Sequence, residues 1–308
     1  MRTVIAGATG FLGRALVGTL RDDGHDVVVL TRDARAGADP DTVQWTPDGE
    51  VGEWARALDG ADAVVNLAGA PIAARRWTRA QKQRILDSRA LATRSLARAI
   101  GRARHPPRVF VSGSGVGYYG SRGDEIVTED TAPGNDFLAE VCQAWEAEAM
   151  AAGGGGTRVA LVRTGLVLAR DGGALEQMKR PFAFFAGGVL GSGRQYLPWI
   201  HRDDWVGIVR MLLLSGDAGG PFNGTGPSPV TNENFTRALA RAMRRPALMR
   251  VPGFVLKAAL GEMAESLLLT GQRAVPARAL AMGYRFTYAT IDEALAAIFA
   301  STTRSISH

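Results

Sequence analysis

Residues 2–13 read Arg2-Thr3-Val4-Ile5-Ala6-Gly7-Ala8-Thr9-Gly10-Phe11-Leu12-Gly13. An apolar run typical of a buried strand leads into three glycines spaced three apart. This pattern predicts a strand, a tight turn and a helix whose first N–H groups point at a nucleotide pyrophosphate. A strand–turn–helix without a ligand is the alternative. We predict that a dinucleotide cofactor is bound by Gly7, Thr9, Gly10, Phe11, Leu12 and Gly13.

Apolar runs alternate with helical stretches through the first half of the chain. Strands are predicted at 2–6, 27–30, 63–67, 109–112 and 158–163, and helices at 11–22, 52–58, 78–102, 136–151 and 204–215. Because these strands are apolar throughout, both faces of the sheet must be covered. The sequence therefore predicts an α/β fold, a doubly wound parallel sheet of the Rossmann type, in residues 1–165.

The second half of the chain is less regular. Glycine and proline clusters occur at 187–188, 191–193, 219–221 and 224–227, with shorter helices predicted at 231–243, 253–270 and 291–299. We predict that residues 166–300 form a mixed substrate or cap region. It includes a small C-terminal domain at about 250–300, and some of its segments return to the sheet.

Composition narrows the class of protein. The 308 residues carry a net charge of +6, but lysine and arginine are dispersed, and their densest group, 75–104, is typical of a solvated helix face. We expect no nucleic-acid partner and, without a long apolar run, no membrane span. The apolar start of the chain is assigned to a strand, not to a leader. The single cysteine, Cys142, and four scattered histidines predict a cytoplasmic protein without a disulfide or metal centre.

The residues after the second strand predict which coenzyme is bound. The strand ends at Thr31 and is followed by Arg32, Asp33 and Arg35. A guanidinium at this position suits the extra phosphate of NADP, whereas an acid there favours NAD. We interpret Asp33 as a turn or helix-capping residue, assign Thr31, Arg32 and Arg35 to cofactor binding, and favour NADP. Further along, the small residues of the Leu67-Ala68-Gly69 loop are expected to line the cofactor, and a plain strand exit is the alternative.

Several motifs are distributed over the whole chain. They are the glycine turn, Asn66-Leu67-Ala68-Gly69, Val116-Gly117-Tyr118-Tyr119-Gly120, Asp136 to Cys142, Trp145-Glu146, Pro198 to Val206 and Gly261-Glu262-Met263-Ala264. Together they resemble the extended short-chain dehydrogenase/reductases, which include nucleotide-sugar epimerases and dehydratases. The closer resemblance is to an atypical subgroup called the epimerase family, which has a small C-terminal domain.

The resemblance implies a catalytic serine, tyrosine and lysine, the last two as Tyr-x-x-x-Lys on one helix. The resemblance implies that the tyrosine exchanges a proton with the substrate, while the lysine lowers the pKa of the tyrosine and holds the ribose of the coenzyme. The matching positions here are Phe137 and Val141, so both groups are absent. The candidates that remain are Ser114 and the phenols of Tyr118 and Tyr119. Ser112 is possible in place of Ser114 but is assigned to the cofactor, and packing is the alternative for both tyrosines.

Other polar residues have weaker claims. Arg163 could lower the pKa of a tyrosine, and Glu140 beside Phe137 could act as an acid or base. For Cys142 we favour buried packing over a reactive thiol. His201, Asp203 and Asp204 are interpreted as a structural turn in which an acid caps a helix. Arg194 and Gln195 are possible substrate contacts by position alone.

Two functions remain open. The first is an NADP(H)-dependent oxidoreductase or epimerase-like enzyme that acts on a small polar molecule such as a sugar nucleotide. The second is a non-catalytic NADPH-binding sensor or regulatory protein. The absence of the tyrosine and lysine favours the second, and a retained substrate region favours the first.

Overall fold

The computed structural model describes residues 1–33 and 41–300. These residues form two compact units. The first contains residues 1–118, 135–163 and 206–222, and the second contains residues 119–134, 164–205 and the described residues from 223 onward.

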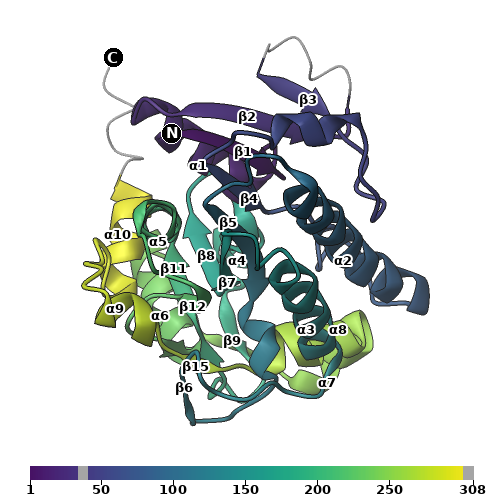
Figure 1. The fold of residues 1–308 in the computed structure, drawn as a ribbon. Helices are drawn as coiled ribbons and strands as arrows, with labels where there is room; N and C mark the ends of the chain where they lie inside the picture. The colour runs from purple at the N-terminus through teal and green to yellow at the C-terminus, as the bar shows by residue number, and fades with distance from the viewer. Residues whose placement is uncertain (34–40, 301–308) are drawn as a thin grey trace. The chain divides into compact units, whose positions relative to one another are not determined.

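A seven-stranded sheet forms the centre of the first unit, in the order β12-β7-β5-β4-β1-β2-β3 (Figure 1). The pairings from β3 through β5 are all parallel. Its strands are β1 (Arg2–Ala6), β2 (Asp26–Thr31), β3 (Thr42–Gln44), β4 (Ala63–Asn66), β5 (Val109–Gly115), β7 (Arg158–Thr164) and β12 (Gly220–Gly224).

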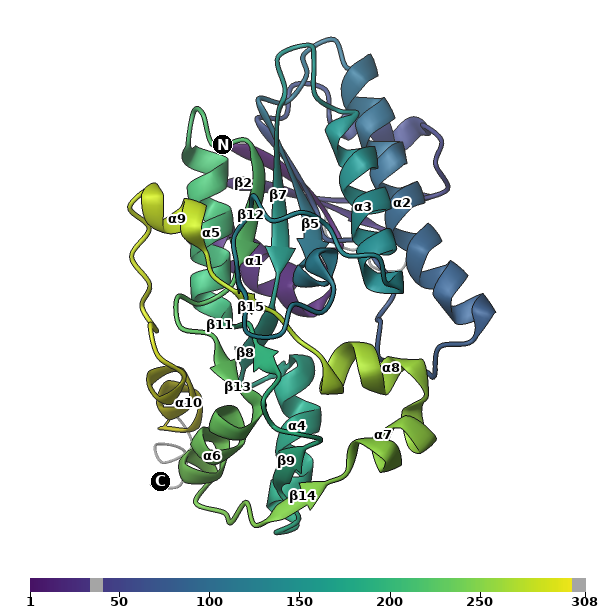
Figure 2. The ribbon, with the colours of Figure 1, turned by 90° about the horizontal axis from the view of Figure 1, so that it is seen from below.

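Helices cover both faces of this sheet, as the uninterrupted apolar strands require. α2 and α3 lie side by side on one face (Figure 2), and an ion pair between Arg210 and Asp23 joins α5 to the end of α1. The described part of the chain also has 3₁₀ helices at Glu53–Ala57 and Val116–Tyr119. The α-helices are α1 (Phe11–Asp22), α2 (Arg79–Arg102), α3 (Phe137–Met150) and α5 (Arg202–Leu214). The predicted doubly wound parallel sheet is confirmed.

The strand order reverses at β1, which has β2 on one side and β4 on the other. Crossover connections that leave such a point in opposite directions open a crevice at the carboxyl ends of the strands, where ligands bind in this architecture. The register places Ala6 opposite Asn66, and Asn66 opposite Ser112. The glycine turn, the loop after β4 and the serines of β5 therefore share one edge.

One core cluster of the first unit lies between the sheet and α2. Val64, Phe110 and Leu96 are fully buried there. At its margin, Trp45 and Trp54 meet edge to face with ring centroids 5.4 Å apart. This packing fixes the strands from which the site residues project.

In the first unit, the helix expected at 52–58 is a short 3₁₀ helix. The glycine and proline cluster at 219–221 belongs to the region from which some segments are predicted to return to the sheet. It contains the start of β12, the edge strand of the sheet, in which Pro221 lies. An edge strand tolerates proline because one side of its backbone needs no partner strand.

The second unit contains four two-stranded sheets: β10–β13, β11–β8, β14–β9 and β15–β6. Their strands are β6 (Ile126–Val127), β8 (Leu166–Ala169), β9 (Gly188–Leu190), β10 (Tyr196–Leu197), β11 (Trp199–His201), β13 (Val230–Thr231), β14 (Met249–Val251) and β15 (Arg273–Ala274). A separate core is built on buried Trp199, Phe235 and Leu295.

The helices of the second unit include one that the sequence predicted as continuous over 253–270. Gly261, at φ +66°, interrupts it, because this left-handed backbone ends an α-helix. The resulting segments are α7 (Gly253–Leu260), α8 (Glu262–Ala264) and a π-helical turn (Glu265–Leu269). The other helices are α4 (Gly173–Ala183), α6 (Asn232–Met243), α9 (Ala277–Ala281) and α10 (Ile291–Ala300).

Asp204 ties the C-terminal segment of the second unit to the start of α5. Its carboxylate, 1% exposed, accepts hydrogen bonds from the amides of Thr287 (2.8 Å) and Tyr288 (3.0 Å) and from the Tyr284 hydroxyl (3.3 Å). The acid expected to cap the following helix is therefore not Asp204, because the partners of its carboxylate lie about eighty residues further along the chain.

We expect Asp204→Ala to lower the free energy of unfolding by about 3 kcal/mol, because it leaves buried amides without an acceptor. The neighbouring Asp203→Ala is the matched control: its side chain is 65% exposed, and a change within about 0.5 kcal/mol is expected. Urea unfolding measures both. Equal effects of the two substitutions would show that Asp204 does not hold this segment.

Candidate functional site

The turn after β1 brings backbone against backbone without room for side chains. Gly7 has φ +81°, and a Cβ built on it would lie 2.5 Å from the carbonyl carbon of Leu67. A Cβ on Gly13 would lie 2.3 Å from the Gly7 carbonyl oxygen. Gly10 is exposed. A Cβ built on Gly10 would lie 3.2 Å from its closest neighbour, the Gly7 carbonyl oxygen. The close packing predicted for Gly7 and Gly13 is therefore present, and Gly10 leaves the backbone accessible.

The first turn of α1 is suited to an anion. Gly10 is the N-cap residue, no side chain caps the helix, and there is no acidic residue in its first turn. The exposed Thr9 and the half-buried Phe11 and Leu12 border this turn. Backbone N–H groups and the helix dipole favour negative charge at such a position. The residues present therefore fit the pyrophosphate of a dinucleotide.

The end of β2 presents an arginine to solvent. Thr31 is buried, and its hydroxyl accepts a hydrogen bond from the amide of Asp33 at 3.3 Å. This bond forms the tight turn that the sequence predicted around Asp33. Arg32 is exposed beside it. Arg35 lies outside the described residues.

The loop after β4 packs against the glycine turn. The Leu67 amide donates to the Ala6 carbonyl at 2.8 Å, and the Ala68 amide donates to the Asn66 side-chain oxygen at 3.1 Å. The amide group of Asn66 donates in turn to the Thr93 hydroxyl on α2 at 2.8 Å. Leu67 and Ala68 are half-buried and Gly69 is exposed. The structure thus brings this loop and the glycine turn together.

Ser114, at the end of β5, belongs to a buried network that the sequence did not predict. Its hydroxyl donates to Glu146 at 2.6 Å, and Arg163 binds both oxygens of the same carboxylate through Nε and Nη2 at 2.8 Å each. All three side chains are less than 9% exposed. Ser112 is fully buried, and its hydroxyl donates to the Gly113 carbonyl at 3.2 Å. The network thus engages Ser114, while Ser112 bonds to its own strand.

A signal for Glu146 was present in the sequence. It lies four residues after Cys142 and seven after Ala139, on the buried stripe of α3. A carboxylate within an apolar helical stripe needs a partner, because a buried unpaired charge is costly. Arg163 on β7 is that partner.

The two tyrosines after β5 have different surroundings. The guanidinium of Arg163 lies over the ring of half-buried Tyr118, with Cζ 3.4 Å from the ring centroid. Tyr119 is fully buried, and its hydroxyl donates to Asn223 at 2.7 Å, while Asn223 donates to the Val275 carbonyl at 2.9 Å. The cation expected near a tyrosine is therefore beside Tyr118, over the face of the ring.

The helix positions that match Tyr-x-x-x-Lys have apolar side chains, which cannot transfer a proton. Phe137 packs edge to face on Trp77, with ring centroids 5.0 Å apart, and the ammonium of Lys82 lies 4.9 Å from its ring centroid. Glu140 is exposed, so the apolar surroundings expected for it are absent.

Cys142 is a buried thiol. Burial, with a smaller contribution from the Glu146 carboxylate, raises the pKa of Cys142 to about 11. Because a thiol reacts as the thiolate, it is inert at neutral pH. This agrees with the packing role favoured from the sequence.

The remaining polar candidates hold the second unit together. Nδ1 of His201 accepts from the Asp203 amide at 3.2 Å, its ring lies 4.0 Å from that of Tyr288, and burial lowers the pKa of His201. Gln195 is buried and donates to the carbonyls of Leu190 (3.0 Å) and Leu268 (2.7 Å), whereas Arg194 is exposed.

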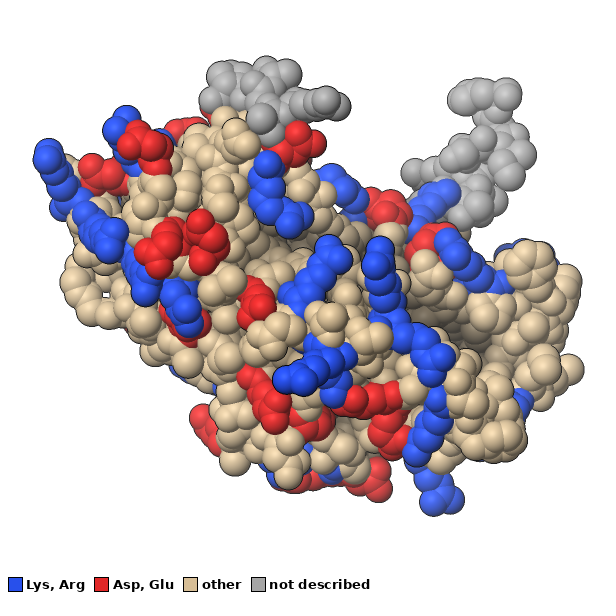
Figure 3. Space-filling view, turned by 90° about the vertical axis from the view of Figure 1, so that its right-hand side faces the viewer, with Lys and Arg blue, Asp and Glu red and all other residues tan. Residues whose placement is uncertain are grey.

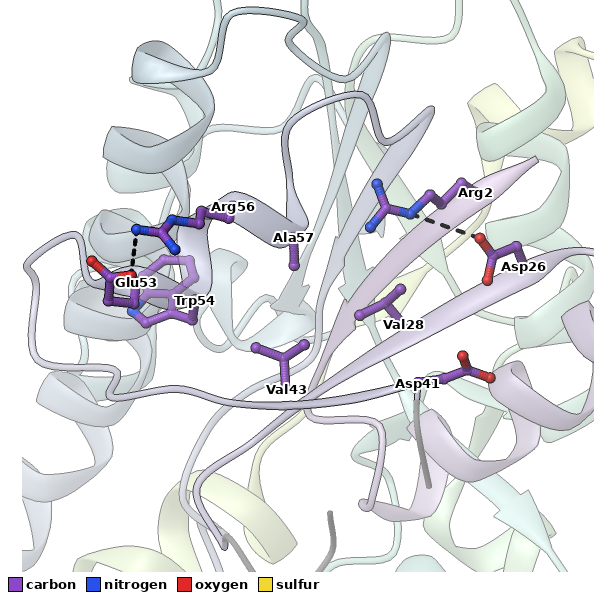
Figure 4. Close-up of a pocket in the computed structure, with 9 residues that line it drawn as sticks. All are labelled: Arg2, Asp26, Val28, Asp41, Val43, Glu53, Trp54, Arg56 and Ala57. Carbon is purple, nitrogen blue, oxygen red and sulfur yellow. Dashed lines mark ion pairs between the residues drawn. The ribbon is translucent and has the colours of Figure 1, made fainter. Parts of the chain in front are cut away.

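A hollow at the amino end of the sheet has a different character. It is bordered by the first residues of β1 and β2, Arg2 and Asp26, which form an ion pair at 3.7 Å, and by Trp54 (Figure 4). The glycine turn lies at the opposite end of β1. The hollow therefore does not belong to the predicted dinucleotide site.

Surface charge and metal ligands add no further site. On the face drawn in Figure 3, basic and acidic side chains are interspersed. Among residues 1–33 and 41–300, no group of three or more histidine, cysteine or acidic side chains is arranged to hold a metal ion. Within the same residues, none of the helices has the length and apolar character needed to cross a membrane.

Residues 3–224 match the model of the NAD dependent epimerase/dehydratase family. The chain belongs to this family. Residues 251–298 match a second model, a domain of unknown function called DUF1731. The resemblance seen in the sequence, to an atypical extended short-chain dehydrogenase/reductase with a small C-terminal domain, is confirmed.

Relatives within the family match almost the whole chain. The epimerase family protein ML0860 of Mycobacterium leprae is 42% identical over 292 residues, which are 94% of this chain and 93% of that protein. Human epimerase family protein SDR39U1, in a crystal structure with NADPH, has a TM-score of 0.90 and 36% identity, covering 97% of this chain and 99% of that one. A nucleoside-diphosphate sugar epimerase from Corynebacterium glutamicum has a TM-score of 0.80 and 32% identity, covering 99% of this chain and 60% of that one.

Glu146→Gln would leave the Arg163 guanidinium buried without a countercharge, and we expect it to lower the free energy of unfolding by about 3–5 kcal/mol. Glu148→Gln on the same helix is the control. Its partner Arg94 is 40% exposed, so a loss of about 1 kcal/mol or less is expected. Denaturant unfolding compares them. A Glu146→Gln variant as stable as Glu148→Gln would contradict a structural ion pair at Glu146.

Proposed function

We propose that this protein binds NADP(H) at the carboxyl edge of the sheet and is an oxidoreductase or an epimerase-like enzyme. The observation that carries the proposal is the glycine turn: its backbone lies against the loop after β4, and the first turn of α1 is left uncapped and free of acids. The human relative whose crystal structure holds NADPH, 36% identical to this chain, supports the same coenzyme.

A cytoplasmic location stays a prediction from the single cysteine.

The preference for NADP over NAD rests on Arg32. The first residue after β2 lies where the adenosine ribose is bound in this architecture, and an exposed guanidinium there can pair with a 2′-phosphate. An acid in the same place would repel that phosphate.

The proposed chemistry uses Ser114 and Tyr118. Bound coenzyme would supply or accept a hydride. The single proton of the Ser114 hydroxyl is directed at Glu146, so its oxygen is left to accept a hydrogen bond. A substrate hydroxyl meets that requirement. The phenol of Tyr118 is the group proposed to exchange a proton with the neighbouring, reacting hydroxyl of the substrate, and Arg163 holds its ring through the contact over its face.

The substrate proposed is a small polar molecule with a reacting hydroxyl, such as a sugar nucleotide. The relative described as a nucleoside-diphosphate sugar epimerase, 32% identical to this chain, supports this class. A second candidate is a non-catalytic NADPH sensor or regulatory protein. It is favoured by Phe137 and Val141, which replace the proton-transferring pair.

We expect Arg32→Ala to weaken NADPH binding about 10- to 100-fold, the usual value of a charge-assisted contact. NADH, which lacks the 2′-phosphate, should bind the variant and the parent protein within about twofold of each other. Isothermal titration calorimetry measures both coenzymes. Equal weakening for NADPH and NADH would place Arg32 elsewhere than at the 2′-phosphate, and no heat for either coenzyme with the parent protein would refute the proposed function.

A turnover assay distinguishes the proposed enzyme from a non-catalytic NADPH sensor. The NADPH- and NADP⁺-loaded protein is incubated with sugar nucleotides and their keto derivatives, and the absorbance of reduced nicotinamide and the sugar products are followed. We expect Tyr118→Phe to lower kcat about 100-fold or more, because it removes the proton donor, with NADPH affinity unchanged. Tyr119→Phe is the control: it loses a buried hydrogen bond and stability, but folded molecules should turn over normally. Unchanged kcat in Tyr118→Phe contradicts the assigned role, and absence of turnover across the panel favours the sensor.

A further inference from the structure

Arg89 on α2 is not part of the solvated basic face expected for residues 75–104. Its side chain is half-buried and crosses the bare Cα of Gly69, where a Cβ would lie 3.1 Å from the guanidinium carbon. Nη1 donates to the carbonyls of Ala70 (3.0 Å) and Ile85 (3.1 Å). These bonds fix the guanidinium against the loop after β4.

The other side of this guanidinium faces α3, which packs beside α2 (Figure 1). The guanidinium carbon of Arg89 lies 5.2 Å from the ring centroid of Trp145, which is on α3. That ring in turn covers Gly113 on β5, where a Cβ would lie 3.0 Å from two ring atoms. The cation therefore lies at the carboxyl edge of the sheet, between the ends of β4 and β5.

Arg89 has no acidic partner among the described residues. Within residues 1–33 and 41–300, Nε and Nη2 make no hydrogen bond and no carboxylate pairs with the guanidinium. Burial lowers the pKa of Arg89, as expected for a cation held away from water, yet a guanidinium remains charged at neutral pH. A fixed cation with two donors to spare is suited to an oxyanion or a sugar hydroxyl.

The order of the strands says which half of a dinucleotide would reach this cation. β2, with Arg32 at its end, lies on one side of β1, and β4 and β5 lie on the other. With the pyrophosphate at the turn after β1 and the adenosine phosphate at β2, the nicotinamide half extends over β4 and β5.

We infer that Arg89 binds the nicotinamide half of the coenzyme, through its ribose hydroxyls or the adjacent phosphate. The positive charge that α3 lacks at Val141 is thereby supplied from α2. This inference rests on the proposed NADP(H) binding. It assigns a specific contact to a residue outside the glycine turn and outside the segment that contains Arg32 and Arg35.

The test compares NADPH with adenosine 2′,5′-bisphosphate, which has the adenosine end but no nicotinamide half. Both are titrated calorimetrically into the full chain and into Arg89→Met, Arg89→Lys and Arg84→Met. Arg84 lies on the same helix and is exposed, so it is the matched control. We expect Arg89→Met to weaken NADPH binding about 10- to 100-fold, with the bisphosphate within about twofold of the parent value. Arg89→Lys should lie between, and Arg84→Met should match the parent.

Each outcome is decisive. Retained bisphosphate binding shows that Arg89→Met is folded, so a selective loss of NADPH affinity supports the contact. Unchanged affinity for both ligands overturns it and leaves Arg89 as a brace for the loop after β4. Equal loss of both ligands also overturns it, since the effect then reaches the adenosine end. A parent protein that binds neither ligand refutes the proposed NADP(H) function itself, which is a different result.

Discussion

The contact between Gly7 and the carbonyl carbon of Leu67 is the constraint from which the candidate site is built. No side chain fits there, so the turn after β1 and the loop after β4 approach as bare backbone. Two further bonds then fix the loop: Asn66 reaches Thr93 on α2, and the Ala70 amide donates to Ser88 at 2.9 Å. Because these bonds set the position of α2 along the loop, Arg89 is placed over Gly69. A steric requirement at residue 7 thus determines where a cation more than eighty residues later lies.

The buried charges near β5 have two different energetic roles. Glu146 and Arg163 satisfy each other through two bonds, and Ser114 adds a third to the carboxylate. Such a pair need not add net stability, but removing either partner is costly, so it fixes the geometry of both side chains. Among residues 1–33 and 41–300, Arg89 has carbonyls and an aromatic ring around it instead of an acid. A half-buried cation without an anion gains from a ligand that supplies one.

Local patterns in the sequence predicted the fold and the turn after β1 because those features depend on neighbouring residues. The glycine spacing fixes the turn at Gly7, and the uninterrupted apolar runs fix a sheet covered on both faces. Glu146 was not predicted as functional, since a helix face becomes buried only when α3 packs on the sheet. The role of Asp204 was not predicted because its partners, Thr287 and Tyr288, are distant in sequence. Arg89 looked like one arginine of a solvated face, and only the packing of α2 on the loop after β4 distinguishes it.

The replacement of the usual tyrosine and lysine is consistent with where polar groups are found instead. Phe137 stacks on Trp77, so the start of α3 contributes an aromatic contact in place of a phenol. The hydroxyls and guanidinium groups that remain come from β5, the turn after it, β7 and α2, each tied to the sheet by hydrogen bonds or ring contacts. Since the proton of Ser114 is already given to Glu146, this serine cannot donate to a substrate carbonyl without breaking that bond. Under the proposed function, the arrangement therefore selects a hydroxyl-bearing partner, which separates it from sites whose serine donates to a ketone.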